Sequence, residues 1–242
     1  MSPNNGPVLV LGAGPGLGMA VARRFGRAGQ PVVLVSRSAN RHAGYVRQLT
    51  AAGIDAMAIA ADLHDLTAIA DVVARATDRF GPIETVYYGP GAADPTARPA
   101  PIEETTVADV EAALRAMLLP AVAVTELVAP GMRQRRSGSL LFATGLASVV
   151  PLPMLGAFAP TSAALRTWAL TLHTSLADDG VHVAALVLGG LIRGGDIHRH
   201  AVAAAPEAMT LPELDPEEIA EAAWRLTVER DQAEAVFNAL TA

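Results

Sequence analysis

Four glycines follow the first apolar run of the chain at alternate positions: Gly12, Gly14, Gly16 and Gly18. The run before them, PVLVL at 7–11, is typical of a strand buried on both faces of a parallel sheet. The segment after them predicts a helix over 17–28. A strand, a glycine-rich turn and a helix in this order predict the first unit of an α/β fold, and such a turn brings backbone N–H groups close to a phosphate. The alternative is a tight strand-to-helix turn without a ligand.

Strand and helix patterns alternate along the rest of the chain. We expect strands at 32–35, 54–60, 84–88, 139–144, 181–188 and 233–240, and helices at 40–52, 65–79, 106–135 and 161–178, with a last helix that Asp215 caps. Parallel strands joined by helical crossovers predict a single-domain, Rossmann-like, doubly wound sheet of about seven strands over residues 1–242. Pro120 is expected to kink helix 106–135, because it leaves the carbonyl of Ala116 without its helical partner.

Composition narrows the possible partners. The 242 residues carry a formal net charge of −6 and no basic block, which argues against a nucleic-acid surface. The chain has no cysteine, so disulfides and thiol chemistry are excluded. The first residues show no targeting pattern, and no apolar run approaches the length of about 18 residues that a membrane span needs. We therefore expect a soluble, cytoplasmic protein without a membrane partner.

The end of the second expected strand indicates which dinucleotide would bind. An acidic residue there would hold the ribose 2′-hydroxyl, but the sequence has Ser36, Arg37 and Ser38. A cation between two hydroxyls suits a 2′-phosphate, which favours NADP(H) over NAD(H). The alternative is that Arg37 is a solvated loop arginine. Asp62, after the third strand, is expected to accept a hydrogen bond from the adenine amino group, to cap helix 65–79, or to do both.

Over nearly its whole length the sequence resembles the short-chain dehydrogenase/reductase family. Four segments carry the resemblance: LGAGPGLG (11–18) is similar to TGxxxGxG, GPIETVYYGPG (81–91) to GxxDxLVNNAG, GSLLFATGLAS (138–148) to GxIVNISSxxG, and 156–190 to the segment from AYxASKAAL to VNxVxPG. The resemblance implies a substrate lid, which we place at 189–214. It also supports cofactor contacts at Gly12, Gly14, Gly16, Leu17, Gly18, Ser36, Arg37, Ser38, Asp62, Leu63, Gly89, Gly91 and Leu191.

The resemblance also implies four catalytic groups, and this chain lacks all four. Where the family has a proton-donating tyrosine, a lysine, a serine and an asparagine, this chain has Phe158, Ser162, Gly145 and Met117. A misalignment does not explain the difference, because all 18 basic residues are arginine and no Tyr-x-x-x-Lys motif can exist. One missing proton-transfer group typically costs about 10²–10⁴-fold in rate. The family mechanism therefore has no proton-transfer group left at these positions.

A few polar residues are weak substitutes. Tyr88 ends the fourth strand, and Ser148 follows the position of the lost serine. Asp196 and His198 lie in the expected lid, where His198 and His200 lack the third ligand of a metal site, so no metal is expected. The alternatives are structural: Tyr88 as a residue that fills space, Ser148 as a loop serine, and the lid charges as solvated groups.

Two functions from different classes fit this sequence. The first is an atypical oxidoreductase that binds NADP(H), with non-redox dehydration, isomerisation or cyclisation as variants. The second is a catalytically inactive, cofactor-binding pseudoenzyme or an oligomer partner of an active homologue. Helices 106–135 and 161–178 are too apolar for one buried face, and the resemblance implies that they pair in a homodimer or homotetramer.

Overall fold

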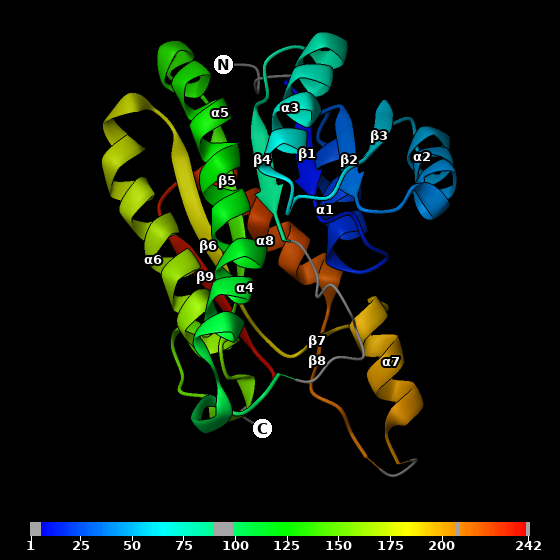
Figure 1. Ribbon diagram of the computed structural model, residues 1–242. Helices are drawn as coiled ribbons and strands as arrows, with labels where there is room; N and C mark the ends of the chain where they lie inside the picture. The colour runs from blue at the N-terminus through cyan, green and yellow to red at the C-terminus, as the bar shows by residue number, and fades with distance from the viewer. Residues whose placement is uncertain (1–5, 90–98, 207–208, 241–242) are drawn as a thin grey trace.

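A seven-stranded parallel sheet forms the centre of the computed structural model, which describes residues 6–89, 99–206 and 209–240 (Figure 1). Its strands are β1 (Val8–Leu11), β2 (Val32–Ser36), β3 (Ala56–Ala60), β4 (Thr85–Tyr88), β5 (Ser139–Gly145), β6 (His182–Gly189) and β9 (Glu234–Asn238). Their order is β3-β2-β1-β4-β5-β6-β9, and every pair is parallel. The prediction of a single-domain, Rossmann-like doubly wound sheet is confirmed.

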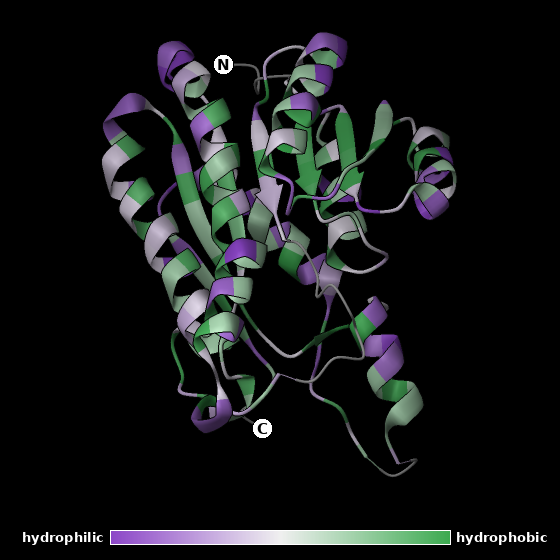
Figure 2. Ribbon diagram, in the orientation of Figure 1, coloured by the Kyte–Doolittle hydropathy of each residue, from purple (hydrophilic) through white to green (hydrophobic). Residues whose placement is uncertain are grey.

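Helices cover both faces of this sheet, because successive side chains of each strand point to opposite sides. The helices are α1 (Leu17–Arg27), α2 (His42–Ala51), α3 (Leu66–Phe80), α4 (Val107–Met117), α5 (Leu119–Arg135), α6 (Phe158–Leu176) and α8 (Pro216–Glu229). One core layer joins α3, α5 and α6 to the sheet, and the other joins α1, α2 and α8 to its opposite face. Figure 2 shows the apolar residues concentrated in the strands and on the helix faces toward them.

The long helix expected at 106–135 is two helices, and the interruption lies before the proline. α4 ends at Met117, Leu118 separates the two, and α5 begins at Leu119 with Pro120 in its first turn. Proline is tolerated there because the first N–H groups of a helix have no helical partner. The expected distortion is present, but it is a break two residues before Pro120 rather than a kink at that residue.

Within the described parts of the chain, Val107–Arg135 is the one helical stretch with the length and composition of a membrane span. The break at Leu118 interrupts it, and α4 and α5 pack on the sheet layer beside α3 and α6. Its apolar character is therefore partly explained by the core. Other apolar residues of the stretch, such as Leu119 and Leu127 of α5, are exposed.

The expected lid at 189–214 contains a small unit of its own. Strands β7 (Leu191–Ile192) and β8 (Glu213–Leu214) pair in parallel, and helix α7 (Asp196–Ala204) lies between them in the sequence. The Leu191 N–H donates to the carbonyl of Pro212 at 2.8 Å, and the Arg193 N–H donates to that of Leu214 at 3.0 Å. Asp215 caps α8 as expected, accepting from the Glu217 N–H at 2.8 Å. The two short strands anchor the lid beside α8.

Candidate functional site: the nucleotide edge of the sheet

The glycine turn has the geometry that a pyrophosphate requires. Gly12 has a φ of 106°, a backbone conformation that favours glycine. A Cβ on Gly18 would lie 2.5 Å from the carbonyl oxygen of Gly12, so only glycine lets α1 pack this close to β1. A Cβ on Gly14 would meet nothing within 4 Å, which leaves open space over the turn. The turn therefore combines a tight backbone with room for a ligand.

The start of α1 offers free donors to that space. Its N-cap is Gly16, no side chain caps it, and no acidic residue stands in its first turn. The first N–H groups of a helix carry a partial positive charge and attract an anion. Leu17, the first residue of α1, is buried against the core, so only its backbone can serve a ligand. These residues fit a dinucleotide pyrophosphate.

The base of the lid contacts this same turn. A Cβ on Gly16 would lie 2.9 Å from Cγ2 of Ile192 and 3.2 Å from Cα of Gly195. Because Gly16 has no side chain, the segment that connects β7 to α7 can pack directly against it. Leu191 is half-buried next to this contact, in β7. The lid and the glycine turn form one surface at the carboxyl ends of β1 and β6 (Figure 1).

At the end of β2 the three residues expected to select the cofactor differ in their surroundings. The Ser36 hydroxyl donates to the carbonyl of Ser38 at 3.1 Å and lies 2.8 Å from Nε2 of His42. Burial lowers the pKa of His42, so its ring stays neutral near pH 7. Arg37 and Ser38 are exposed, and the Ser38 hydroxyl accepts from the Asn40 N–H. Ser36 therefore orders the turn, while Arg37 and Ser38 face solvent.

At the end of β3, one of the two interpretations of Asp62 is wrong. The residue that caps α3 is Asp65, whose Oδ1 accepts from the Thr67 N–H at 3.0 Å. Asp62 is exposed and accepts from the His64 N–H at 3.0 Å, so one carboxylate oxygen orders the turn. Its expected role toward adenine stays a prediction. Leu63 is buried in the core and offers only its backbone.

The turn after β4 has no room for a side chain at Gly89. Its N–H donates to the carbonyl of Leu11 at 2.9 Å, and a Cβ there would collide with the hydroxyl of Tyr87. Glycine is required because the Tyr87 ring takes the place of any side chain. Gly91, the other contact expected here, lies outside the described residues.

The fold brings together three of the four expected catalytic positions. A Cβ on Gly145, at the end of β5, would lie 3.2 Å from Oγ of Ser162 in α6. Phe158 lies one turn before Ser162 on the same helix, with 39% of its surface exposed. α6 begins at Phe158, three residues before its expected start, so all three positions flank the same corner of the site. The corner presents a phenyl ring, a buried hydroxymethyl group and a bare backbone.

The sequence profile that matches this chain is that of the short chain dehydrogenases, over residues 7–195. The chain belongs to the short-chain dehydrogenase family. It is 27% identical over 188 residues to the ketoacyl reductase HetN of Nostoc sp., an alignment that covers 78% of this chain and 64% of that protein. It covers as little as 51% of the length of other curated relatives.

Solved structures of other proteins share the fold. A metagenomic short-chain oxidoreductase in complex with NADP has a TM-score of 0.79 and 22% identity, covering 98% of this chain and 99% of that one. A 7α-hydroxysteroid dehydrogenase in complex with NADH and 7-oxo glycochenodeoxycholic acid has a TM-score of 0.85 and 20% identity, covering 99% and 94%.

Tyr88, a possible substitute for the missing family tyrosine, has a structural role. Its hydroxyl donates to the carbonyls of Met117 at 2.9 Å and of Ala116 at 3.2 Å. The ring is fully buried, and burial raises the pKa of the hydroxyl far above its usual value. A phenol that is buried and already donating to two carbonyls is unsuited to give its proton to a substrate. The Met117 side chain has no part in this contact, which uses its backbone.

The other candidate substitutes for the missing catalytic groups are Ser148, Asp196 and His198. Each of them is either bound to another residue or buried. Asp196 pairs with Arg41 and Arg199, and His198 Nε2 lies 2.7 Å from Oε1 of Glu213. The Ser148 hydroxyl is buried and makes no hydrogen bond among the described residues. Thr144 donates to the carbonyl of Ser162 at 2.9 Å. In these contacts Asp196 and His198 serve the lid, which favours the structural interpretation over the catalytic one.

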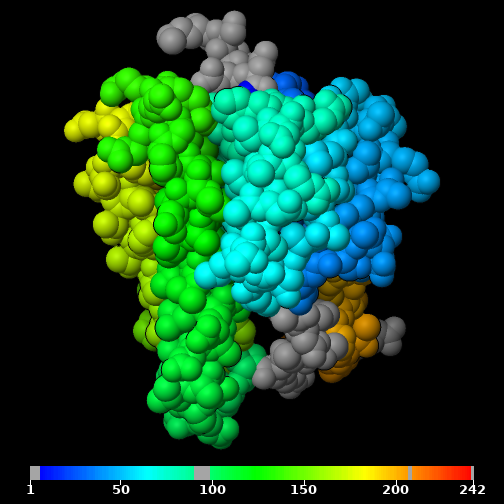
Figure 3. Space-filling view, turned by 45° about the horizontal axis from the view of Figure 1, so that its top comes forward, coloured from blue at the N-terminus to red at the C-terminus, as the bar shows by residue number. Residues whose placement is uncertain are grey.

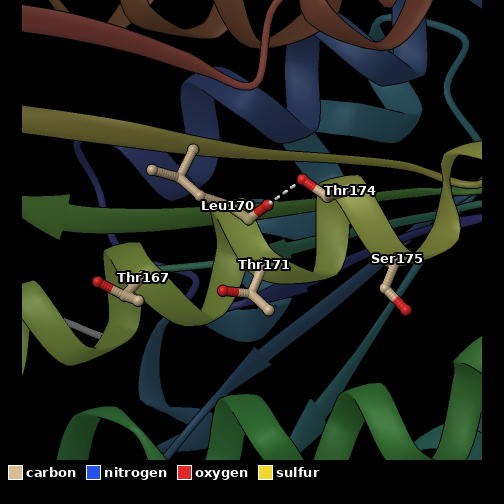
Figure 4. A pocket seen from close by; sticks show the side chains of 5 residues that line it. All are labelled: Thr167, Leu170, Thr171, Thr174 and Ser175. Carbon is tan, nitrogen blue, oxygen red and sulfur yellow. Dashed lines mark hydrogen bonds between the residues drawn. The ribbon is translucent and has the colours of Figure 1, made fainter.

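A separate groove of about 450 Å³ runs along the outward side of α6. It is lined by Thr167, Leu170, Thr171, Thr174 and Ser175, of which Thr167, Thr171 and Ser175 follow one side of the helix (Figure 4). A second groove continues it toward Leu118 and the start of α5. The two grooves are lined by threonine, serine and apolar side chains without titratable groups, which suits contact with another protein surface rather than chemistry.

Proposed function

We propose that this short-chain dehydrogenase binds NADP(H) and carries out no proton transfer of the family's Tyr–Lys–Ser type. The observation that carries the proposal is the contrast along one edge of the sheet. The glycine turn keeps open space at Gly14 and free donors at the start of α1, while the reaction corner holds Gly145, Phe158 and Ser162. Nucleotide binding and proton handling use different residues, so one can persist without the other.

The preference for NADP(H) rests on the end of β2. Arg37 is exposed there between the hydroxyls of Ser36 and Ser38, and no carboxylate stands at these positions to hold an unphosphorylated ribose. A guanidinium forms charge-assisted hydrogen bonds with a phosphate. One related structure was solved with NADP and another with NADH, so the choice depends on this chain's own residues.

Carbonyl reduction needs a hydride at carbon and a proton at oxygen. NADPH would supply the hydride, and the protein would orient it. At the reaction corner no side chain has a proton of suitable acidity, because a phenyl ring has none and a buried serine hydroxyl is a very weak acid. A redox reaction in this site would therefore take its proton from solvent or from the substrate itself.

A second candidate function is a cofactor-binding protein without catalysis. It is favoured by the contacts of Tyr88, Asp196 and His198, each of which is already engaged in holding the fold or the lid. In that case occupancy by the nucleotide would itself be the function, either as a sensor or within an oligomer.

Fluorescence titration with NADPH and NADH tests the proposal directly. We expect saturable binding of NADPH, weaker binding of NADH, and a selective loss of NADPH affinity in Arg37→Gln. NADPH oxidation with a panel of aldehydes and ketones then separates the two candidates. Family-like turnover would contradict the proposal, and failure to bind either nucleotide would remove both candidates.

We also propose a homodimer or homotetramer in which α5 and α6 pair with a second copy. The grooves lie along α6 and reach Leu118, and Leu119 and Leu127 of α5 are exposed. The left-hand side of Figure 1 shows α5 and α6 with no further helix outside them. An apolar surface of this kind is typical of an interface between subunits.

A further inference from the structure

Helix α7 is held by polar contacts rather than by hydrophobic packing. None of its residues from Asp196 to Ala204 is buried. Within the described chain, side-chain contacts tie it to distant elements at Asp196, which binds Arg41, and at His198, which binds Glu213. In Figure 3 α7 (orange) lies beneath the blue half of the molecule, away from the green α4. Its position at the nucleotide edge therefore depends on a few charged groups.

The contact between Asp196 and Arg41 is a two-point ion pair. Nη1 of Arg41 lies 2.6 Å from Oδ2 of Asp196, and Nη2 lies 3.0 Å from Oδ1. Arg199 binds the same carboxylate from within α7. The hydrogen bonds from Arg41 lower the pKa of Asp196, so the carboxylate is ionised at neutral pH. One carboxylate thus faces two guanidinium groups, and the cluster keeps a net positive charge.

Arg41 lies where the adenosine half of a dinucleotide would bind. It ends the short 3₁₀ helix η1 (Ala39–Arg41), directly after the turn that contains Arg37 and Ser38. The next residue, His42, contacts Ser36 at the last position of β2, which holds η1 against the carboxyl edge of that strand. In this fold the ribose of the adenosine lies at that edge. The cation that holds the lid is therefore next to the expected site of a 2′-phosphate.

We propose that Asp196 competes with the 2′-phosphate of the dinucleotide for Arg41, so that NADP(H), but not NAD(H), releases α7 from the nucleotide edge. The inference rests on the proposed binding of NADP(H). A phosphate monoester carries up to two charges and three acceptor oxygens, whereas Asp196 offers one charge, and the pair is half-exposed. Arg41 is thereby a specificity-determining residue that also controls the lid, whose base rests on Gly16.

Hydrogen exchange of α7 in the intact protein tests the release. The probes are 2′,5′-ADP, which carries the 2′-phosphate without a nicotinamide, and 5′-ADP, which lacks that phosphate. We expect saturating 2′,5′-ADP to speed exchange over 196–204 and saturating 5′-ADP to leave it unchanged. Asp196→Asn should show the faster exchange without any nucleotide.

Binding of the same two probes tests the competition. Asp196→Asn should bind 2′,5′-ADP about twofold to fivefold more tightly, the range expected for loss of one competing exposed ion pair. Its affinity for 5′-ADP should not change. Arg41→Gln should weaken 2′,5′-ADP by about tenfold, the scale of one charged hydrogen bond. Glu213→Gln is the matched control, because it loosens the other tether of α7 and should leave the ratio of the two affinities unchanged.

Two results would overturn the inference while the proposed function stands. One is a wild-type protein that binds 2′,5′-ADP without any change in α7 exchange. The other is an Asp196→Asn variant that gains no affinity for 2′,5′-ADP. A wild-type protein that binds neither of the two probes, and neither NADP(H) nor NAD(H), would instead overturn the proposed function. The inferred competition for Arg41 would then be overturned as well.

Discussion

The hydroxyl of Tyr88 donates to the backbone carbonyl of Met117 across 2.9 Å and also reaches the carbonyl of Ala116 at 3.2 Å. These carbonyls end α4, where the break at Leu118 and the ring of Pro120 interrupt the helical hydrogen bonds. A buried acceptor without a donor is costly, so the phenol stabilises the break. Tyr88, at the end of β4, thus supports the backbone instead of the reaction.

Replacing Tyr88 by Phe should therefore destabilise the protein without changing its affinity for nucleotide. The variant keeps the ring and leaves carbonyls at the helix break unpaired, which costs about 1–3 kcal/mol for a buried group. Urea unfolding measures the loss, and NADPH titration of the folded variant provides the comparison. A stable variant with lost NADPH oxidation would instead make Tyr88 a catalytic residue.

Two glycines of the first turn should respond differently to alanine. A Cβ at Gly18 would lie 2.5 Å from the backbone oxygen of Gly12, which cannot move away, so Gly18→Ala should lower the free energy of unfolding by more than about 2 kcal/mol. Gly14→Ala meets nothing within 4 Å and serves as the matched control, with a change below about 0.5 kcal/mol. Equal losses from both variants in thermal or urea unfolding would contradict this account of the turn.

The buried His182 should make the protein sensitive to mild acid. Burial, with His173 and Arg230 nearby, lowers the pKa of His182 to about 4, and its Nε2 has no hydrogen-bond partner among the described residues. The folded state therefore prefers the neutral ring. This contribution to stability is complete above the unfolded pKa of about 6.5 and is lost as the pH falls from there toward 4, by roughly 2–3 kcal/mol.

The measurement is urea unfolding of wild type and His182→Leu at a series of pH values. Carboxylates titrate in part of the same range in both proteins, so the difference between them isolates the histidine. The wild-type protein should lose more stability than His182→Leu between pH 6.5 and 4. If the free energy of unfolding falls equally in both proteins over this range, the ring is either protonated in the folded state or buried there without a free-energy cost.

The proposed subunit interface on α6 should be sensitive to a single charge. Thr171 lines both grooves, so Thr171→Arg would place an unpaired guanidinium in a surface of uncharged hydroxyl and apolar side chains. We expect sedimentation or light scattering to show dissociation to monomers. Ala70→Arg, at an exposed position on α3, adds the same charge elsewhere and should keep the oligomer. A monomeric wild-type protein, or an unchanged oligomer in Thr171→Arg, would remove this interface.

The sequence predicted the sheet well because buried parallel strands are continuous apolar runs, which need no tertiary information to recognise. The helix break at Leu118 was predicted only approximately, since a proline marks a lost hydrogen bond without fixing where the chain adjusts. The partner of the freed carbonyls could not be predicted, because Tyr88 precedes Met117 by 29 residues.

The site shows the same division between local and distant information. The glycine turn and the four absent catalytic groups are local patterns, and the fold brings three of those four positions, Gly145, Phe158 and Ser162, to one corner. The lid is different. Asp196 and Arg41 are 155 residues apart in the sequence. Taken alone, each has the sequence pattern of an ordinary charged surface residue. Strands of two residues, such as β7 and β8, are also too short to give a periodic signal.

Restoring the family's residues at the reaction corner should raise the rate of carbonyl reduction above that of the wild-type chain. The three changes are Gly145→Ser, Phe158→Tyr and Ser162→Lys, at positions that the fold brings together. The new phenol would give its proton to a carbonyl oxygen, the ammonium four residues later would lower the pKa of that phenol, and the new hydroxyl would polarise the carbonyl. With NADPH and small aldehydes, the triple variant should exceed the wild-type rate by at least about 100-fold.

The double variant Gly145→Ser with Phe158→Tyr is the matched control. Without the ammonium its phenol keeps a pKa near 10, so most of the gain should be absent. Because the three groups act as a unit, their effects should be strongly non-additive. A triple variant that folds, binds NADPH and still reduces no aldehyde would show that the surroundings of the corner, and not only its three side chains, have lost the geometry for hydride transfer.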